Sequence, residues 1–430
     1  MRIVAFVCCS LAALLFFPGA KGQVNTITPD HIYHQNIATV KLTPPGEMLG
    51  LPIIALNSGD QLELQFDDLQ AEIKSYFYTL QLCNADWTPA SVNTIDYLRG
   101  FSEVQIRDYK FSSVALQKYV HYKARIPSSN STPTRAGNYL LKVYLDGDTN
   151  RLAFTRRLMV INNKSGVAGW ISQPTNPKLF RNSQKINVSV NTKGLNIQNP
   201  FDQLKIVIQQ NFRWDNAITG IKPMFIKGDV IEYNAEQDCI FPAFKEWRWV
   251  DLRSFRLQTE RVRNTQYLRN GTVINVMPDV PRDNQIYQYL RDINGMYDPA
   301  TIEDYNIQFE GDYARVNFNF PMKEPFAGYD MYIFGELTQY ELNDRNKMVW
   351  NGEKGAYEGA LFLKQGYYNY VYGLVDKTRP NAPMSTEFTE GNWWETENAY
   401  TVLVYYRTLG GRHDELVGML RMNSLTNRQR

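Results

Sequence analysis

The chain has 430 residues, with 46 Lys and Arg against 44 Asp and Glu and a formal net charge of +2 at pH 7. A nucleic-acid-binding protein needs a clustered excess of basic residues to replace phosphate counterions, so this balance argues against nucleic acid as a partner. It equally disfavours a protein that binds anionic membrane surfaces, while 27 tyrosines and 22 phenylalanines suit an exported β-protein.

Residues 1–22 have the parts of a secretory signal peptide: a positive n-region, an apolar h-region and small residues before the cleavage point, namely Arg2, residues 3–17, Ala20 and Gly22. We predict cleavage before Gln23, with an uncleaved anchor as the alternative. Removing Arg2 and Lys21 from the 46 basic residues leaves 44, equal to the 44 acidic ones. No second run of about 18 apolar residues follows, so we expect no direct membrane insertion.

Two cysteines remain after this cleavage, Cys83 and Cys239. Export permits a disulfide between them, but only their geometry can decide whether one forms. We favour two buried free thiols, with the disulfide as the alternative.

Alternation of apolar and polar residues at period two predicts strands over 60–69, 76–87, 139–148 and 153–162. Gly137 and the pair Asp146-Gly147 supply the turn chemistry that closes such strands into a hairpin. We therefore predict a first domain over residues 23–162, an immunoglobulin-like β-sandwich. The Cys…Trp…Cys spacing of antibody domains is missing, so this likeness is architectural only.

Further strands are expected over 184–192, 202–216, 229–235 and 246–259, giving a second β-sandwich over 163–298 with at most a short helix at 282–293. The third domain, 299–430, has expected strands over 313–321, 329–342, 346–363, 366–376 and 400–407. Its strand order resembles the starch-binding-like early-set (carbohydrate-binding-like) sandwich. The predicted fold class is all-β, with three β-sandwich domains in series, because this length is too great for one sandwich core.

The strand over 400–407 is expected to be the last long strand of the third domain. Tyr400, Val402, Val404 and Tyr406 would lie on one face, and Thr401, Leu403 and Tyr405 on the other. Both faces carry apolar residues, so we expect this strand to be covered on both sides.

Before that strand lie three carboxylates beside two tryptophans: Glu390, Glu395, Glu397, Trp393 and Trp394. Hydrolysis of a glycosidic bond requires two carboxyls about 5–9 Å apart on opposite sides of that bond. Acids on one loop are not opposed across a cleft, and no partner acid is marked elsewhere. We therefore predict no enzyme here.

Aromatic residues that could stack on sugar rings also lie in the third domain: Trp350, Tyr357, Tyr367, Tyr368, Trp393 and Trp394. The alternative is that they are core and half-buried strand residues.

Another segment, 245–263, mixes arginines with aromatics and acids. It could be a stacking platform for single-stranded nucleic acid, a salt-bridged sheet face, or a face that docks on an acidic protein rim, and the export signal and charge balance disfavour the first.

The four histidines are His31, His34, His121 and His413, and no cysteine or acidic cluster with metal spacing accompanies them. A Cys83–His121 nucleophile pair would require adjacent strands, and no oxyanion loop is indicated. Nucleotide-binding and hydrolase motifs are missing from the sequence. We expect no metal, no cofactor and no catalysis.

Two long segments resemble one family closely. The first, 78–127, contains "YTLQLCNADW", "DYLRGF", "IRDYKFSS" and "YVHYKARIP"; the second contains "EGNWWETENAYTVLVYYR" followed by "DELVG". "EWRWVDLRSFR" and "RDINGMY" between them also fit, so the chain is similar to the plug protein of the type IX secretion system. Asp96 stands where the pattern has Glu, which keeps the charge. The signature positions, structural or interfacial, are Cys83, Asp86, Trp87, Tyr97, Gly100, Phe101, Tyr119, His121, Tyr122, Trp247, Trp249, Trp393, Trp394, Glu397, Asn398 and Tyr400.

The resemblance implies a periplasmic protein that binds the periplasmic opening of a large outer-membrane β-barrel translocon. Such a plug closes the pore when no substrate is in transit, and acts as a monomer within a complex of different proteins. The alternative function is a carbohydrate-binding periplasmic or surface module that uses the aromatic residues of the third domain.

Overall fold

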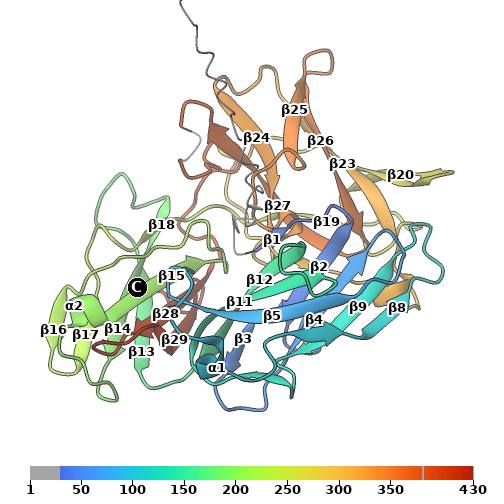
Figure 1. Cartoon of the computed structure of the whole chain (residues 1–430). Helices are drawn as coiled ribbons and strands as arrows, with labels where there is room; N and C mark the ends of the chain where they lie inside the picture. The colour runs from blue at the N-terminus through green and yellow to red at the C-terminus, as the bar shows by residue number, and fades with distance from the viewer. Residues whose placement is uncertain (1–29, 380–381, 430) are drawn as a thin grey trace, which may run out of the picture.

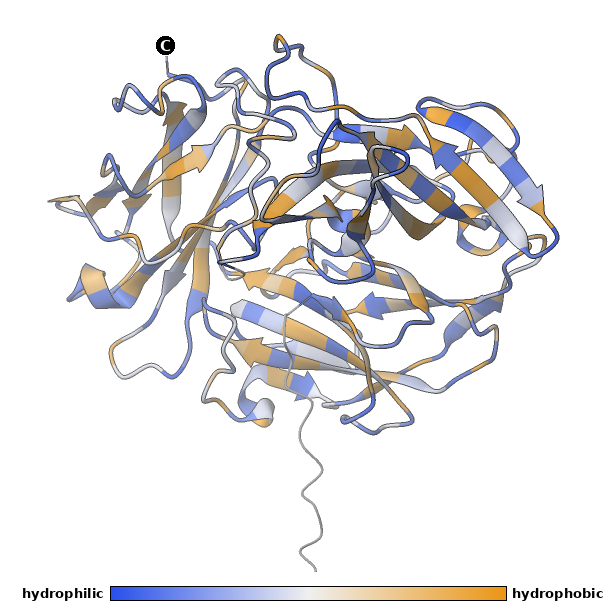
Figure 2. Ribbon diagram, turned by 90° about the horizontal axis from the view of Figure 1, so that it is seen from above, coloured by the Kyte–Doolittle hydropathy of each residue, from blue (hydrophilic) through white to orange (hydrophobic). Residues whose placement is uncertain are grey.

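The computed structural model describes residues 30–379 and 382–429, so the predicted signal peptide, 1–22, lies outside the described residues. Nearly all regular structure is β-strand, in several sheets (Figure 1), which confirms the all-β fold class. Figure 2 shows hydrophobic and hydrophilic residues banded along the strands, the pattern from which they were predicted. Within the described ranges we find no helix with the length and apolarity needed to cross a membrane.

The N-terminal unit, 30–162, packs two sheets over one core. A six-stranded sheet in the order β1-β12-β11-β5-β7, with β3 parallel to β12, faces a four-stranded sheet in the order β2-β4-β9-β8; β10 pairs β6 separately. The predicted β11–β12 hairpin is confirmed. The elements are β1 (His31–Ile32), β2 (Ile37–Thr43), β3 (Ile53–Ala55), β4 (Leu62–Asp68), β5 (Tyr76–Cys83), α1 (Thr94–Tyr97), β6 (Leu98–Gly100), β7 (Val104–Ile106), β8 (Asp108–Phe111), β9 (Val120–Ile126), β10 (Ser131–Pro133), β11 (Gly137–Leu145) and β12 (Leu152–Ile161).

The middle unit combines two segments that are far apart in sequence, 163–243 and 396–429. A sheet in the order β13-β14-β17-β16, with β18 beside β14, faces a sheet in the order β15-β28-β29. Its elements are β13 (Gly166–Ser172), β14 (Ser183–Asn191), α2 (Pro200–Gln203), β15 (Leu204–Gln210), β16 (Phe225–Lys227), β17 (Val230–Tyr233), β18 (Ile240–Pro242), β28 (Ala399–Tyr406) and β29 (Glu415–Asn423).

The structure corrects our assignment of the strand at 400–407 to the third sandwich. This strand, β28, pairs antiparallel with β15 from Leu204↔Tyr406 to Gln210↔Tyr400, and so belongs to the middle unit. The expectation that both its faces are covered is confirmed. Tyr400 and its face pack in the core of the middle unit, whereas Leu403 and Tyr405 pack against Ala85, Met159 and other residues of the N-terminal unit.

The curled unit, 244–395, is a nine-stranded sheet in the order β19-β27-β24-β25-β26-β23-β21-β20, with β22 beside β27. The ring of Phe318 on β23 lies 5.0 Å from that of Tyr370 on β27, because the sheet curls around one core. The elements are β19 (Arg248–Asp251), β20 (Val262–Leu268), β21 (Gly271–Val276), β22 (Tyr297–Asp298), α3 (Ile307–Glu310), β23 (Tyr313–Pro321), β24 (Tyr329–Phe334), η1 (Glu336–Thr338), β25 (Lys347–Asn351), β26 (Ala356–Lys364) and β27 (Tyr367–Asp376).

Strand pairing therefore crosses the predicted boundary between residues 298 and 299. Strands β19, β21 and β22 lie in the range expected for the second sandwich, yet they bond to β23 and β27, and β20 joins the sheet through β21. Residues 282–293 contain no helix. We propose the three units defined above as the domain division, in place of three consecutive sandwiches.

Cys83 and Cys239 are both buried and free, as favoured from the sequence. Burial raises the pKa of the Cys83 thiol to about 11 and that of Cys239 to about 12, so neither forms the reactive thiolate at neutral pH. We expect no reaction with Ellman's reagent at pH 8 in the native protein, and release of two equivalents by the mature chain in denaturant. Fast labelling of the folded protein would contradict this burial.

Candidate functional site: the joints between the units

The loop after β5 joins the N-terminal unit to the middle unit. The backbone N–H of Ala85 donates to the Asp414 carboxylate at 3.0 Å, and the Arg407 guanidinium donates to the Asn84 side chain at 2.8 Å. Two of the signature segments, "CNADW" and "VLVYYR…RHDELVG", therefore touch each other directly. Their shared role in the fold is a joint between units.

Asp414 is the centre of this first joint. Its buried carboxylate also accepts from Arg407 Nε at 2.7 Å and from Lys205 Nζ at 2.9 Å. Burial opposes ionisation, but the hydrogen bond from Ala85 and the two cations lower the pKa of Asp414. Gly137 has φ +146°, and a Cβ there would lie 3.0 Å from the Asp414 carbonyl oxygen. Only glycine allows this close approach.

Trp87 fills the same joint beside Trp214 of the middle unit. The ring centroids are 5.0 Å apart in an edge-to-face arrangement, and the Arg157 guanidinium lies 5.1 Å and 5.0 Å from the two centroids. These are favourable aromatic and cation–π geometries. Asp86 next to it points outward and accepts from the Thr88 hydroxyl at 2.6 Å.

A buried ion pair forms the second joint, between the N-terminal and curled units. Lys364 Nζ, on β26, lies 2.6 Å from Asp67 Oδ2, on β4, and these side chains are only 2% and 1% exposed. The same carboxylate receives His121 Nδ1 at 2.7 Å and the Tyr313 hydroxyl at 2.6 Å. Burial opposes ionisation of Asp67, but Lys364 and His121 lower its pKa. The Asp67 carboxylate thus binds side chains of both units: His121 of the N-terminal unit, and Lys364 and Tyr313 of the curled unit.

Lys41 makes a second contact across this joint. Its ammonium lies 2.7 Å from Glu336 Oε2 and 3.9 Å from the ring centroid of Tyr297. Both partners belong to the curled unit, and Lys41 belongs to β2 of the N-terminal unit. The two pairs together oppose separation of these units.

A buried charge network anchors the tryptophan-bearing loop in the curled unit. Arg248 Nε lies 3.0 Å from both Glu390 oxygens, Arg248 Nη1 lies 2.8 Å from Asp279, and Arg282 lies 2.7 Å from Glu390. Burial opposes ionisation of Glu390, but the charges of Arg248 and Arg282 outweigh it and lower its pKa to about 2. Asp279 also accepts from Arg261. The Glu390 carboxylate is therefore a fixed anion at neutral pH.

From Glu390 the loop crosses to the middle unit. The backbone N–H of Trp394 donates to the Arg181 carbonyl at 2.9 Å, and Glu397 accepts from Asn294 on one unit and Asn423 on the other. Arg213 of the middle unit lies 5.9 Å from the ring of Trp247 in the curled unit. These contacts form the third joint.

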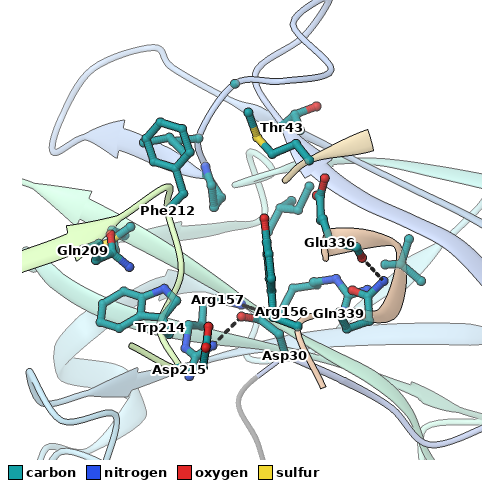
Figure 3. A pocket seen from close by; sticks show the side chains of 18 of the residues that line it. Asp30, Thr43, Arg156, Arg157, Gln209, Phe212, Trp214, Asp215, Glu336 and Gln339 are labelled. Carbon is teal, nitrogen blue, oxygen red and sulfur yellow. Dashed lines mark hydrogen bonds and ion pairs between the residues drawn. The ribbon is translucent and has the colours of Figure 1, made fainter. Parts of the chain in front are cut away.

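The three units also surround a cavity of about 250 Å³ (Figure 3). Arg156, only 6% exposed, lines it, and one of its terminal nitrogens, Nη2, has no hydrogen-bond partner among the described residues. The acids in its wall are paired with basic groups: Asp30 with Arg157, Asp215 with Arg213, Glu336 with Lys41 and Glu341 with His31. The acids of the wall are therefore neutralised, and Arg156 is a cation of the wall for which no ion pair is found among the described residues.

Comparison with known proteins gives the family. The model of the type 9 secretion system plug protein 1st domain matches residues 37–162, within the N-terminal unit. A crystal structure of a hypothetical protein from Parabacteroides merdae ATCC 43184 is 31% identical with a TM-score of 0.88, and the match covers 92% of this chain and 98% of that one. No curated protein matches.

The chain belongs to the type 9 secretion system plug protein family. This confirms the resemblance carried by the sequence segments. In this family member the signature residues fall into three groups. At joints lie Trp87, Tyr119, His121, Trp247, Trp394 and Glu397; in unit interiors lie Cys83, Tyr97, Tyr122, Trp249 (half-buried), Asn398 and Tyr400; on the surface lie Asp86, Gly100, Phe101 and Trp393. Whether any contacts a partner stays a prediction.

The carboxylates and aromatics of the plug family member do not assemble as a sugar site would require. A glycosidase acid needs a raised pKa and a second carboxyl opposite it. The pKa of Glu390 is lowered. Burial raises the pKa of Glu397, but its two oxygens are bound by Asn294 and Asn423. Tyr357 and Tyr368 are buried, Trp350 packs edge-on against Tyr357, and Trp393, 38% exposed, stacks on Tyr287. These rings form no common exposed platform.

The other candidate sites also stay apart. Cys83 lies in the six-stranded sheet of the N-terminal unit and His121 in the four-stranded one, so they are not on adjacent strands. Across the described ranges no group of three or more His, Cys, Asp or Glu side chains could hold a metal ion. Sequence reasoning missed Asp67, Lys364 and Asp414, which looked like ordinary strand and turn polar residues.

Proposed function

We propose that this protein is a non-catalytic periplasmic plug. It binds the periplasmic opening of the outer-membrane β-barrel translocon of the type IX secretion system and closes the pore in the absence of substrate. It acts as a monomer within that complex, without a cofactor.

One observation carries the proposal: buried charges at the joints fix three sheet units to one another. In the assembled fold both Asp67 and Lys364 are buried, so removing either partner would leave the other buried and unpaired at a cost of about 3–5 kcal/mol. A body that blocks a wide pore must keep its shape under load, so this construction suits a plug. The alternative, a carbohydrate-binding module, lacks support because the third-domain aromatic residues that it would use form no common exposed platform among the described residues.

Co-purification tests the proposal directly. A tagged copy of the chain, expressed in a cell that has the secretion system, should retain the solubilised outer-membrane barrel. Deletion of the gene should leave viable cells whose outer membrane admits large antibiotics more readily. A translocon purified without any plug, together with unchanged permeability, would contradict the function.

A further inference from the structure

The outer face of the curled sheet carries a groove of about 770 Å³ over strands β20, β21, β23, β25 and β26. Asn264, Asn275 and Asn317 face one another on three neighbouring strands, and Ala360 continues their row on β26. Asn275 Nδ2 donates to Asn264 at 2.8 Å, and Asn317 Nδ2 donates to Asn275 at 3.0 Å. The floor is therefore a row of fixed amides that ends at a small side chain.

Basic residues surround this floor although the whole chain is nearly neutral. The groove is lined by five basic residues and two acidic ones: Arg263, Arg315, Arg345, Lys347 and Lys354 against Asp344 and Glu358. Both lysines are already paired, with Asp330 and Glu358 respectively. No ion pair is found for the three arginines within the part of the chain that the structure describes. Arg315 Nε donates to Asn317 at 3.3 Å, and its remaining nitrogens, with the guanidinium groups of Arg263 and Arg345, are available to bind carboxylates.

Most arginines of the Arg-rich segment 245–263 are paired with acids, so unpaired arginines are a feature of the groove and not of the whole segment. Arg248, Arg253 and Arg261 of that segment are paired with Asp279, Asp251 and Asp279. The salt-bridged interpretation from the sequence therefore holds for them. Arg263 instead turns outward into the groove. A solvated sheet face is usually polar, but here it is hollow and carries an unpaired excess of positive charge.

We propose that this groove binds an extended acidic segment of a protein partner, which, if the proposed function is correct, belongs to the translocon. Arginine pairs with carboxylates in a bidentate geometry, and the amide row offers donors and acceptors to a main chain. Four strands spaced about 4.8 Å apart span roughly 14 Å, the length of about four extended residues.

The lining favours a peptide over an acidic glycan. Sugar rings bind by stacking on exposed aromatic faces, and the aromatic side chain that borders the groove, Phe318, is buried in the core. Charge complementarity across such an interface chiefly sets specificity and the rate of association. The groove would thus recognise its partner without making the complex irreversible.

A labelled peptide of about seven residues that alternates Glu or Asp with β-branched residues tests the groove. The full mature chain should bind it, and a counterpart with Gln and Asn in place of the acids should bind at least about tenfold more weakly. The double variant Arg263→Glu with Arg315→Glu should lose at least about tenfold in affinity. The matched control, Arg107→Glu with Arg269→Glu, changes the net charge equally at exposed sites outside the groove and should bind as the native chain does.

Equal binding of the acidic and amide peptides would overturn the proposal, and so would tighter binding of polygalacturonate than of the acidic peptide. Retention of the translocon barrel by the native, control and groove-variant chains distinguishes this proposal from the plug function. If the native chain fails to retain the translocon, the plug function is wrong. If the native and control chains retain it and the groove variant does so equally, the groove proposal is wrong and the plug function stands.

Discussion

We expect the substitution Arg248→Met to lower the free energy of unfolding by about 3–5 kcal/mol, because it removes the cation shared by two buried carboxylates. Those carboxylates, Glu390 and Asp279, lie 3.0 Å and 2.8 Å from the guanidinium. Arg282 and Arg261 would each remain beside one of them. Neither bridges both, so part of the buried charge is left uncompensated. Urea unfolding followed by tryptophan fluorescence measures the loss.

A matched control lies on the same segment. Arg256 is 81% exposed and lies 3.7 Å from Glu303, and solvent-exposed pairs contribute about 0–1 kcal/mol. Arg256→Met should therefore unfold close to the native chain. Similar unfolding midpoints for the two variants would show that the Arg248 network does not hold the tryptophan-bearing loop.

The same network gives the stability of the native chain a pH dependence. Burial opposes ionisation of Glu390, yet Arg248 and Arg282 lower its pKa from 4.5 to about 2. A carboxyl whose folded pKa is depressed contributes its full stabilisation above the unfolded pKa and loses it as the pH falls through the folded pKa. Stability should thus fall between about pH 5 and pH 2. Glu390→Gln should have lower stability at neutral pH and a shallower fall in this window.

The individual strands could be predicted from the sequence because each has at least one face in a core. β4, β11 and β27 follow the period-two pattern, and the two covered faces of β28 were visible in its run of apolar residues. The partner of β28 could not be predicted. Gln210 and Tyr400 are 190 residues apart, and their pairing depends on how three units pack, which no local pattern records.

The joints were harder to predict than the strands. The signature segments marked which stretches matter, but not what they touch. Asp67 stands at the end of β4, where a charged residue would usually face solvent. The structure shows the curled unit covering that position and supplying Lys364 to it. A charge that another unit buries has the same sequence pattern as a charge in water, so only the assembled fold distinguishes them.

Lys364 gives the sharpest test of the joints. Lys364→Met should cost about 3–5 kcal/mol, because the buried Asp67 keeps only His121 and Tyr313 as partners. Asp67 and Lys364 belong to different units, so the loss should concentrate between units. Backbone hydrogen exchange should rise first at the amides that bond across this joint, those of Ser113, Leu116 and Gln117. Lys347→Met, which breaks a half-exposed pair with Asp330, should change stability by less than about 1 kcal/mol.

Adding Asp67→Asn to Lys364→Met should recover much of the loss, because the uncompensated buried charge is then gone while its hydrogen-bonding shape stays. A double variant as unstable as the sum of the two single ones would contradict a pairwise charge effect. The same series connects stability to the proposed function. If a fixed arrangement of units is what closes the pore, Lys364→Met should leak large antibiotics and the double variant should leak less, while both still bind the barrel.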